Sequence, residues 1–289
     1  MKIRISGKTD IGNGRLNNED AFSFCTDLTK TIWDTSSVEE YIRTGELGSI
    51  SIIADGMGGE NAGETASSIA IESLKQDLTP PLLSTVIGSD ETIKNYLFQI
   101  ILNANNAILK HMELEPDTIG MGTTIVVVWI LNEKAYIAWC GDSRCYVFNP
   151  KRGIKCLSKD HSYVQELIDK GNITPQKSFN HPKSNIITRW LGNFFVEPEI
   201  TVYDIHKHDQ FLLCSDGLNG YCKDRNIERV LYKEFLDVDK CCNALVDLAL
   251  KSGGQDNISV IKISTLEDNE SEITISLKEK LIRFFKLIF

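Results

Sequence analysis

Two kinds of hydrophobic pattern alternate along the chain. Apolar residues recur at helical spacing over residues 64–78, where the repeat consists of Ala66, Ile69, Ala70, Ser73 and Leu74. This pattern predicts a helix that ends before the two prolines at positions 80 and 81. A longer repeat predicts a second helix over residues 91–112, whose apolar side carries Ile93, Leu97, Ile100 or Ile101, Ala104, Ile108 and Met112.

Short runs rich in β-branched and aromatic residues predict strands elsewhere. After the alternating Ile3 and Ile5, these runs cover residues 21–24, 48–56, 123–131, 134–142, 145–150, 153–158, 200–205, 209–217 and 257–265. Further helices are expected at 162–171, 224–235 and 238–251. Residues 27–48 are polar and lack a clear repeat, which predicts a loop insertion, and residues 172–192 predict a mobile surface segment.

The order of these elements favours an α+β fold. Strands and helices occur in groups, whereas a doubly wound sheet alternates them one by one. The 289 residues suffice for one large core. We expect one domain over residues 1–265, followed by an acidic linker and a tail over residues 266–289.

Composition narrows the function classes. The formal net charge of −9 argues against a nucleic-acid-binding protein, which needs a cationic face. None of the eight cysteines forms a CxxC pair, so we expect buried free thiols in a reducing compartment. The sequence begins without the apolar core of a signal peptide, and no run reaches the roughly 20 apolar residues of a membrane span. These features predict a cytoplasmic protein.

Five short motifs place acidic residues at the ends of apolar runs. They contain Glu19 and Asp20 in NNEDAF, Asp55 and Gly56 in ADG, Asp142 in GDSR, Asp216 in SDG and Asp256 in QDN. A single Asp-Gly after a strand is usually only a turn. Five together suggest a cluster of carboxylates, which divalent cations would relieve of mutual repulsion. Oxygen ligands suit Mg²⁺ or Mn²⁺ better than zinc.

The ordered set of motifs resembles the protein phosphatase 2C family of metal-dependent (PPM) serine/threonine phosphatases. The resemblance covers about residues 5–265 and includes RLNNEDAF, ADGMGG, GMGTT, GDSR, SKDHS, ITRWLG, SDGL and GGQDNIS. Residues 162–192 resemble a flap beside the active site in the bacterial branch. The resemblance implies a four-layer α-β-β-α sandwich with metals at one end.

Matching motif by motif assigns a role to each site residue. Family likeness implies that Asp55 bridges two metals, that the Gly56 carbonyl binds the second, and that Asp216 and Asp256 complete the first. Glu19 and Asp20 are expected to act on the second metal through waters, and Asp142 is expected to share a third, weaker metal with Asp216. Arg15 matches the phosphate-binding arginine, whose planar fork suits bidentate contact. Asp55, Asp216 and Arg15 are therefore the expected catalytic residues.

The implied reaction is hydrolysis of phosphoserine and phosphothreonine in proteins, with a Ser/Thr kinase and its targets as partners. Two cations about 3.5–4 Å apart can lower the pKa of a water between them, and the resulting hydroxide attacks phosphorus in line. Some family members have a histidine two residues after the metal aspartate, but this chain has Met57. Two candidates therefore remain for the group that protonates the leaving oxygen, a water and His161. For His161 a structural role is the favoured interpretation.

Two alternatives and the tail complete the expectations. A catalytically dead phosphatase fold used as a binding module would have lost a metal aspartate, and a nuclease-type two-metal site would mix histidine into its ligands; neither feature occurs here. The tail carries Leu277, Leu281, Phe284, Phe285 and Ile288 on one side of a basic amphipathic helix. Docking on its own domain and contact with a membrane surface or a partner protein stay open for this tail.

Overall fold

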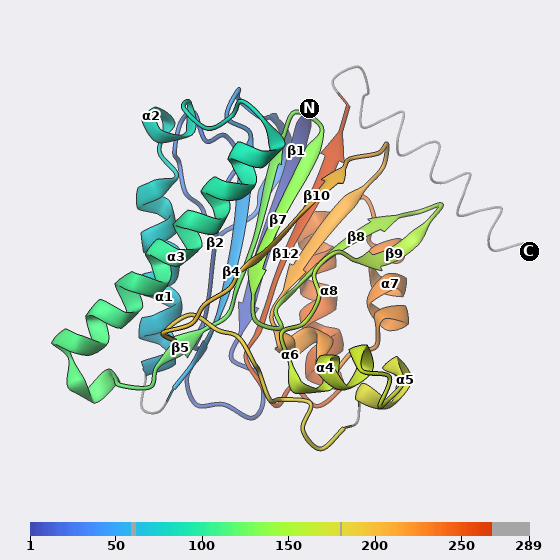
Figure 1. Cartoon of the computed structure of the whole chain (residues 1–289). Helices are drawn as coiled ribbons and strands as arrows, with labels where there is room; N and C mark the ends of the chain where they lie inside the picture. The colour runs from blue at the N-terminus through green and yellow to red at the C-terminus, as the bar shows by residue number, and fades with distance from the viewer. Residues whose placement is uncertain (59–61, 180, 268–289) are drawn as a thin grey trace, which may run out of the picture.

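The chain folds into two antiparallel sheets that pack face to face between two layers of helices (Figure 1). The computed structural model describes residues 1–58, 62–179 and 181–267. One sheet has the order β3-β1-β12-β11-β8-β9, formed by Val38–Arg43, Lys2–Asp10, Ile258–Leu266, Gln210–Cys214, Arg144–Asn149 and Gly153–Cys156. The other has the order β10-β7-β6-β4-β2, formed by Glu199–Asp204, Lys134–Cys140, Ile125–Leu131, Ser49–Met57 and Asp20–Cys25, and the short β5 (Gly122–Thr123) pairs with β4.

Helices cover the outer face of each sheet (Figure 1). The β4 side is covered by α1 (Ala62–Asp77) and α3 (Asp90–Leu114), and the β12 side by α7 (Asp224–Lys233) and α8 (Val238–Lys251). Shorter helices are α2 (Pro80–Leu83), the 3-10 turn η1 (Pro116–Thr118), α4 (Tyr163–Asp169), α5 (Pro175–Ser178) and α6 (Asp216–Asn219). The predicted α-β-β-α architecture is therefore confirmed.

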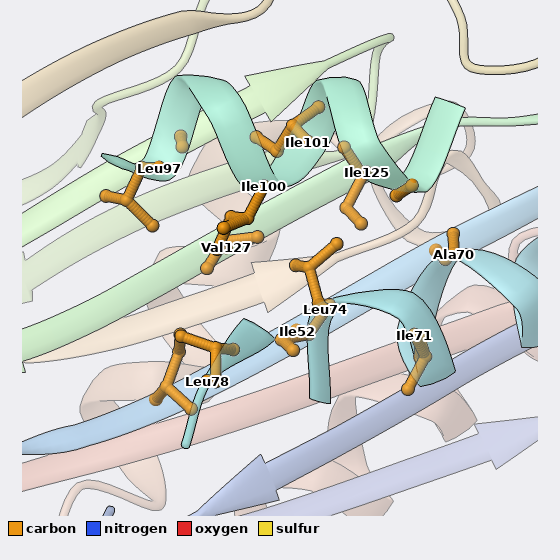
Figure 2. Packing of buried hydrophobic residues seen from close by; sticks show 14 of the residues in the cluster. Ile52, Ala70, Ile71, Leu74, Leu78, Leu97, Ile100, Ile101, Ile125 and Val127 are labelled. Atoms are coloured by element: carbon orange, nitrogen blue, oxygen red, sulfur yellow. The ribbon is translucent and has the colours of Figure 1, made fainter. Parts of the chain in front are cut away.

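Strands β4 and β6 carry apolar residues on both faces because both of their faces are buried. In β4, Ile52 packs under the helices, whereas its neighbour Ile53 lies in the core between the sheets. The same alternation separates Val127 from Val126 in β6. Figure 2 shows the outer core, where Leu74 of α1, Leu78 just after that helix, and Leu97, Ile100 and Ile101 of α3 lie over Ile52, Ile125 and Val127.

The predicted long helix is confirmed. It begins after Ser89, whose hydroxyl accepts a hydrogen bond from the Thr92 backbone N–H and so caps the first turn. The sequence pattern left open whether Ile100 or Ile101 lies on the buried side, and the structure buries both. In α1 the buried face contains Ile71, while Ser73 is only partly buried.

Two irregular segments proved more ordered than predicted. Residues 27–48 contain the edge strand β3, whose polar sequence VEEYIR hides it from a hydrophobic pattern search. The segment 172–192 contains α5, and its second half is tied down where Ile187 bridges Ser162 and Leu191 bridges Thr123.

Several expectations about composition can also be checked. All eight cysteines are free, and seven of them are buried, as predicted. Within the described ranges, no helix combines the length and the apolarity that crossing a membrane requires. The amphipathic tail predicted at residues 277–288 lies outside the described residues, which end at 267.

Candidate metal and phosphate site

Two strand ends bring the first pair of carboxylates together. Asp20 begins β2 and lies directly opposite Asp55 in the antiparallel register with β4. Directly opposed residues place their side chains on the same face of a sheet, with Cβ atoms about 5 Å apart. Asp20 is only 8% exposed, so two carboxyl groups meet where water can do little to separate their charges.

The other three aspartates approach the same point from the facing sheet and its turns. Asp216 begins α6 directly after β11, Asp142 lies in the turn between β7 and β8, and Asp256 precedes β12. Electrostatic repulsion from Asp20, Asp216, Asp142 and Asp256 raises the pKa of Asp55, after the larger effect of burial. The five predicted aspartates therefore converge on one site.

Burial raises the pKa values of four of these carboxyl groups. It raises the pKa of Asp20 to about 7 and that of Asp216 to about 6. It also raises the pKa values of Asp55 and Asp142 well above the ordinary range for aspartate. For Asp216, repulsion by Asp256 is the next largest cause, and a hydrogen bond with Asp55 acts in the opposite direction. Near neutral pH the cluster thus holds protons, unless cations replace them.

Arg15 lies in the site but binds a carboxylate. Its Nε and Nη2 contact Oδ1 and Oδ2 of Asp256, each at 2.8 Å, in a bidentate ion pair. The Arg15 side chain is 47% exposed, so its guanidinium faces the solvent from which a phosphate would arrive. Asp256 must leave this pair before both of its oxygens can bind a metal.

Glu19 and Gly56 join the site to the start of α1. The Glu19 carboxylate accepts a hydrogen bond from the Gly63 backbone N–H, and burial raises its pKa. The Gly56 N–H donates to the Glu19 carbonyl at 3.1 Å. A Cβ at Gly56 would lie 2.2 Å from the Gly63 carbonyl oxygen, so only glycine fits there. Glu19 therefore caps a helix, besides lying near the other carboxylates.

Hydroxyl groups hold the central aspartates in place. The Ser215 Oγ donates to Asp20 Oδ2 at 2.7 Å. The Asp55 carbonyl accepts from Thr123 Oγ1 at 2.9 Å and from the Thr124 N–H at 2.8 Å. The two threonines of the GMGTT motif therefore hold the Asp55 backbone in position. Ser215 was not predicted, and its position before Asp216 is the only sequence signal it carries.

His161 has a structural position. Its Nδ1 accepts a hydrogen bond from the Gly141 N–H at 3.1 Å, which leaves the proton on Nε2, 3.2 Å from Glu199 Oε1. The ring stacks on Trp139, and burial lowers its pKa. His161 therefore braces the turn that carries Asp142. Arg144, from the same turn, forms two hydrogen bonds of 2.7 Å with the carboxylate of Asp160.

The donor set suits hard divalent cations. Asp20 Oδ1 and Asp142 Oδ1 are buried and have no hydrogen-bond partner in the protein, so each oxygen is available to a cation. Carboxylate oxygens are the ligands that Mg²⁺ and Mn²⁺ prefer. In residues 1–58, 62–179 and 181–267, however, no three acidic, histidine or cysteine side chains stand in a ready-made ligand arrangement. Asp256 is turned toward Arg15, so cation binding has to rearrange side chains of the cluster.

Comparisons with known proteins identify a family of relatives. The family model described as protein phosphatase 2C matches residues 15–167. The serine/threonine protein phosphatase PstP of Mycobacterium tuberculosis is 33% identical over 262 residues, which are 90% of this chain and 45% of that protein. The chain thus spans about half the length of that relative. The serine/threonine phosphatase stp of Listeria monocytogenes is 35% identical over 74% of this chain and 83% of its own length.

Solved structures of relatives share the fold. The phosphatase PstP/Ppp of Mycobacterium tuberculosis superposes with a TM-score of 0.77 at 31% identity, covering 92% of this chain and 100% of that one. The catalytic domain of PstP in complex with two manganese ions has a TM-score of 0.73 at 30% identity, with 92% and 99% coverage. The phosphatase Stp1 of Staphylococcus aureus has a TM-score of 0.76 at 31% identity, with 91% and 94% coverage.

Proposed function

The chain belongs to the protein phosphatase 2C family, and we propose that it is a Mg²⁺- or Mn²⁺-dependent phosphatase of phosphoserine and phosphothreonine in proteins. The observation that carries the proposal is the convergence of five aspartates on one site. Burial, together with repulsion among the carboxylates, raises the pKa values of four of them, Asp20, Asp55, Asp142 and Asp216. A relative of the same fold is described with two manganese ions. The alternative of a dead binding module has no support, because none of the metal-site aspartates is missing.

Each site residue has a proposed part in this activity. Asp55 would hold both cations, Asp216 and Asp256 would complete the first, and the Gly56 carbonyl would bind the second. Bound cations supply a water whose pKa is lowered toward neutrality. Asp20 and Glu19 would act on the second cation through waters while Ser215 and Gly63 fix their carboxylates. Asp142, with one partnerless buried oxygen, would serve a third, weaker site shared with Asp216.

Arg15 would bind the phosphoryl group once Asp256 is occupied by a cation. Its fork of N–H donors matches two phosphoryl oxygens as well as it matches the carboxylate it now holds. Met57 offers no proton to the leaving oxygen, and His161 directs its proton to Glu199. The proton for the seryl or threonyl oxygen is therefore assigned to water.

The biological setting is also a proposal. The named relatives are serine/threonine phosphatases, which supports phosphorylated proteins as substrates and a Ser/Thr kinase as the opposing enzyme. We place the activity in the cytoplasm, where free buried thiols are stable. The tail beyond residue 265 is proposed to contact a membrane surface, a partner protein or its own domain.

Hydrolysis of p-nitrophenyl phosphate and of a phosphothreonine peptide tests the proposal. Activity should appear with Mn²⁺, disappear with EDTA and return when Mn²⁺ is added in excess. Asp216→Ala should lack activity, because it removes a proposed ligand of the first cation. Asp90→Ala is the control: Asp90 pairs with Lys134 at the opposite end of β7 from Asp142, and its loss should leave turnover unchanged. Hydrolysis that survives chelation would refute the metal-dependent mechanism.

A further inference from the structure

Asn257 joins three of the chain segments that carry the proposed phosphate and metal residues. Its amide Nδ2 donates to the carbonyls of Ile11 and Asn17, each at 2.9 Å. Its Oδ1 accepts from the Glu19 N–H at 2.8 Å. The residue is 3% exposed, so these hydrogen bonds are shielded from water. One side chain therefore fixes both ends of the loop that carries Arg15.

The backbone of Asn257 fixes the third segment. A Cβ on Gly217 would lie 1.9 Å from the Asn257 carbonyl oxygen, so the start of α6 packs directly against this residue. Asn257 also follows Asp256, and its own N–H donates to Asp256 Oδ1 at 2.9 Å. Contacts of one buried asparagine thus help to fix the positions of Arg15, Asp216 and Asp256.

We propose that Asn257 is a positioning residue that holds the guanidinium of Arg15 beside the aspartate cluster, where it can bind the phosphoryl group of the substrate. This inference rests on the proposed phosphatase activity. An asparagine is needed because the two carbonyls require donors and the Glu19 N–H requires an acceptor. Leucine has neither function, and aspartate has no donor.

The arrangement makes a specific kinetic prediction. Arg15 would contact the phosphoryl group both in the bound substrate and in the transition state, so its displacement weakens binding more than turnover. Asn257→Ala should therefore raise KM for both p-nitrophenyl phosphate and a phosphothreonine peptide about tenfold, the effect of losing roughly one charge-assisted contact. The affinity for Mn²⁺, followed by isothermal titration, should change less than KM does.

A double-mutant cycle separates positioning from general stability. If Asn257 acts through Arg15, then Asn257→Ala should add less than twofold to the KM of Arg15→Ala. Asn257→Ser leaves a smaller cavity than Asn257→Ala and keeps one hydroxyl that can form a hydrogen bond. It should have the same effect on KM, and it replaces the alanine variant if that one folds poorly. Independent, multiplicative effects of the two substitutions would overturn the proposal.

Asn149 provides the matched control. It is 6% exposed, lies at the end of β8 farthest from Asp142, and makes comparable hydrogen bonds to Lys207, Asp209 and Lys151. Asn149→Ala should lower the melting temperature without changing KM. A rise in KM equal to that of Asn257→Ala would contradict the proposal. Absence of any Mn²⁺-dependent turnover in the unmodified protein would instead reject the proposed function itself.

Discussion

Asp55→Asn is expected to lower kcat/KM by at least about 10³-fold, which corresponds to about 4 kcal/mol of transition-state stabilisation. Asp55 lies close to all the other aspartates of the cluster, since repulsion from Asp20, Asp216, Asp142 and Asp256 raises its pKa. An amide keeps the shape of the side chain but supplies no negative charge to hold two cations. Steady-state hydrolysis of a phosphothreonine peptide over a range of Mn²⁺ concentrations measures the loss.

The same substitution should stabilise the metal-free protein. Asp55 opposes Asp20 across the β2–β4 pair, and both are buried. Removing one ionisable group from such a pair relieves repulsion and the desolvation of a charge. Thermal unfolding in EDTA at pH 8 should show a higher melting temperature for Asp55→Asn than for the unmodified chain, with Asp90→Asn as an exposed control. A variant that stays active, or that is less stable in EDTA, would count against the role assigned to Asp55.

The stability of the metal-free protein is expected to fall as the pH rises from 5 to 8. Aspartates whose pKa is raised in the folded state bind more protons there than in the unfolded chain. Their contribution to stability is thus full below the ordinary pKa and is lost as the pH passes through the raised value. For Asp216 and Asp20 the raised values are about 6 and about 7. These two aspartates alone should lower the free energy of unfolding by about 4 kcal/mol over this interval, at 1.36 kcal/mol per pKa unit.

Urea unfolding in EDTA at several pH values measures this slope. His161 acts in the opposite direction, because burial lowers its pKa and its neutral form is favoured as the pH rises. The comparison with Asp20→Asn/Asp216→Asn removes that background, since the double variant keeps His161. Excess Mn²⁺ should also flatten the profile and should stabilise the protein more at pH 8 than at pH 5. A slope that is identical with and without the two aspartates would contradict the cluster.

Much of the fold could be predicted from hydrophobic periodicity. The face of α3 that runs from Ile93 to Ile108 is buried as its spacing indicates, and the strands of the two sheets follow the apolar runs. The pattern missed β3, because an edge strand of sequence VEEYIR has little apolar surface to bury. It also gave no sign that Leu191 and Ile187 pair with distant segments, since isolated bridges leave no repeat.

The site was less accessible to sequence reasoning. Each aspartate could be located at a strand end, but their convergence depends on strand register, such as Asp20 opposite Asp55. Likeness to a known family supplied that convergence before the structure did. The ion pair of Arg15 with Asp256 and the contacts of Asn257 join residues more than 230 positions apart, so no local pattern reveals them.

In the proposed mechanism, the aspartate cluster binds the cations on which catalysis depends. Crystals of the protein grown with Mn²⁺ and measured at the manganese absorption edge test it most directly. Two anomalous peaks are expected, each within about 2.2 Å of an Asp55 carboxylate oxygen, with Asp216 and Asp256 on one of them and Arg15 released from Asp256. Peaks only elsewhere, or an Arg15–Asp256 ion pair that persists in an actively hydrolysing crystal, would contradict it.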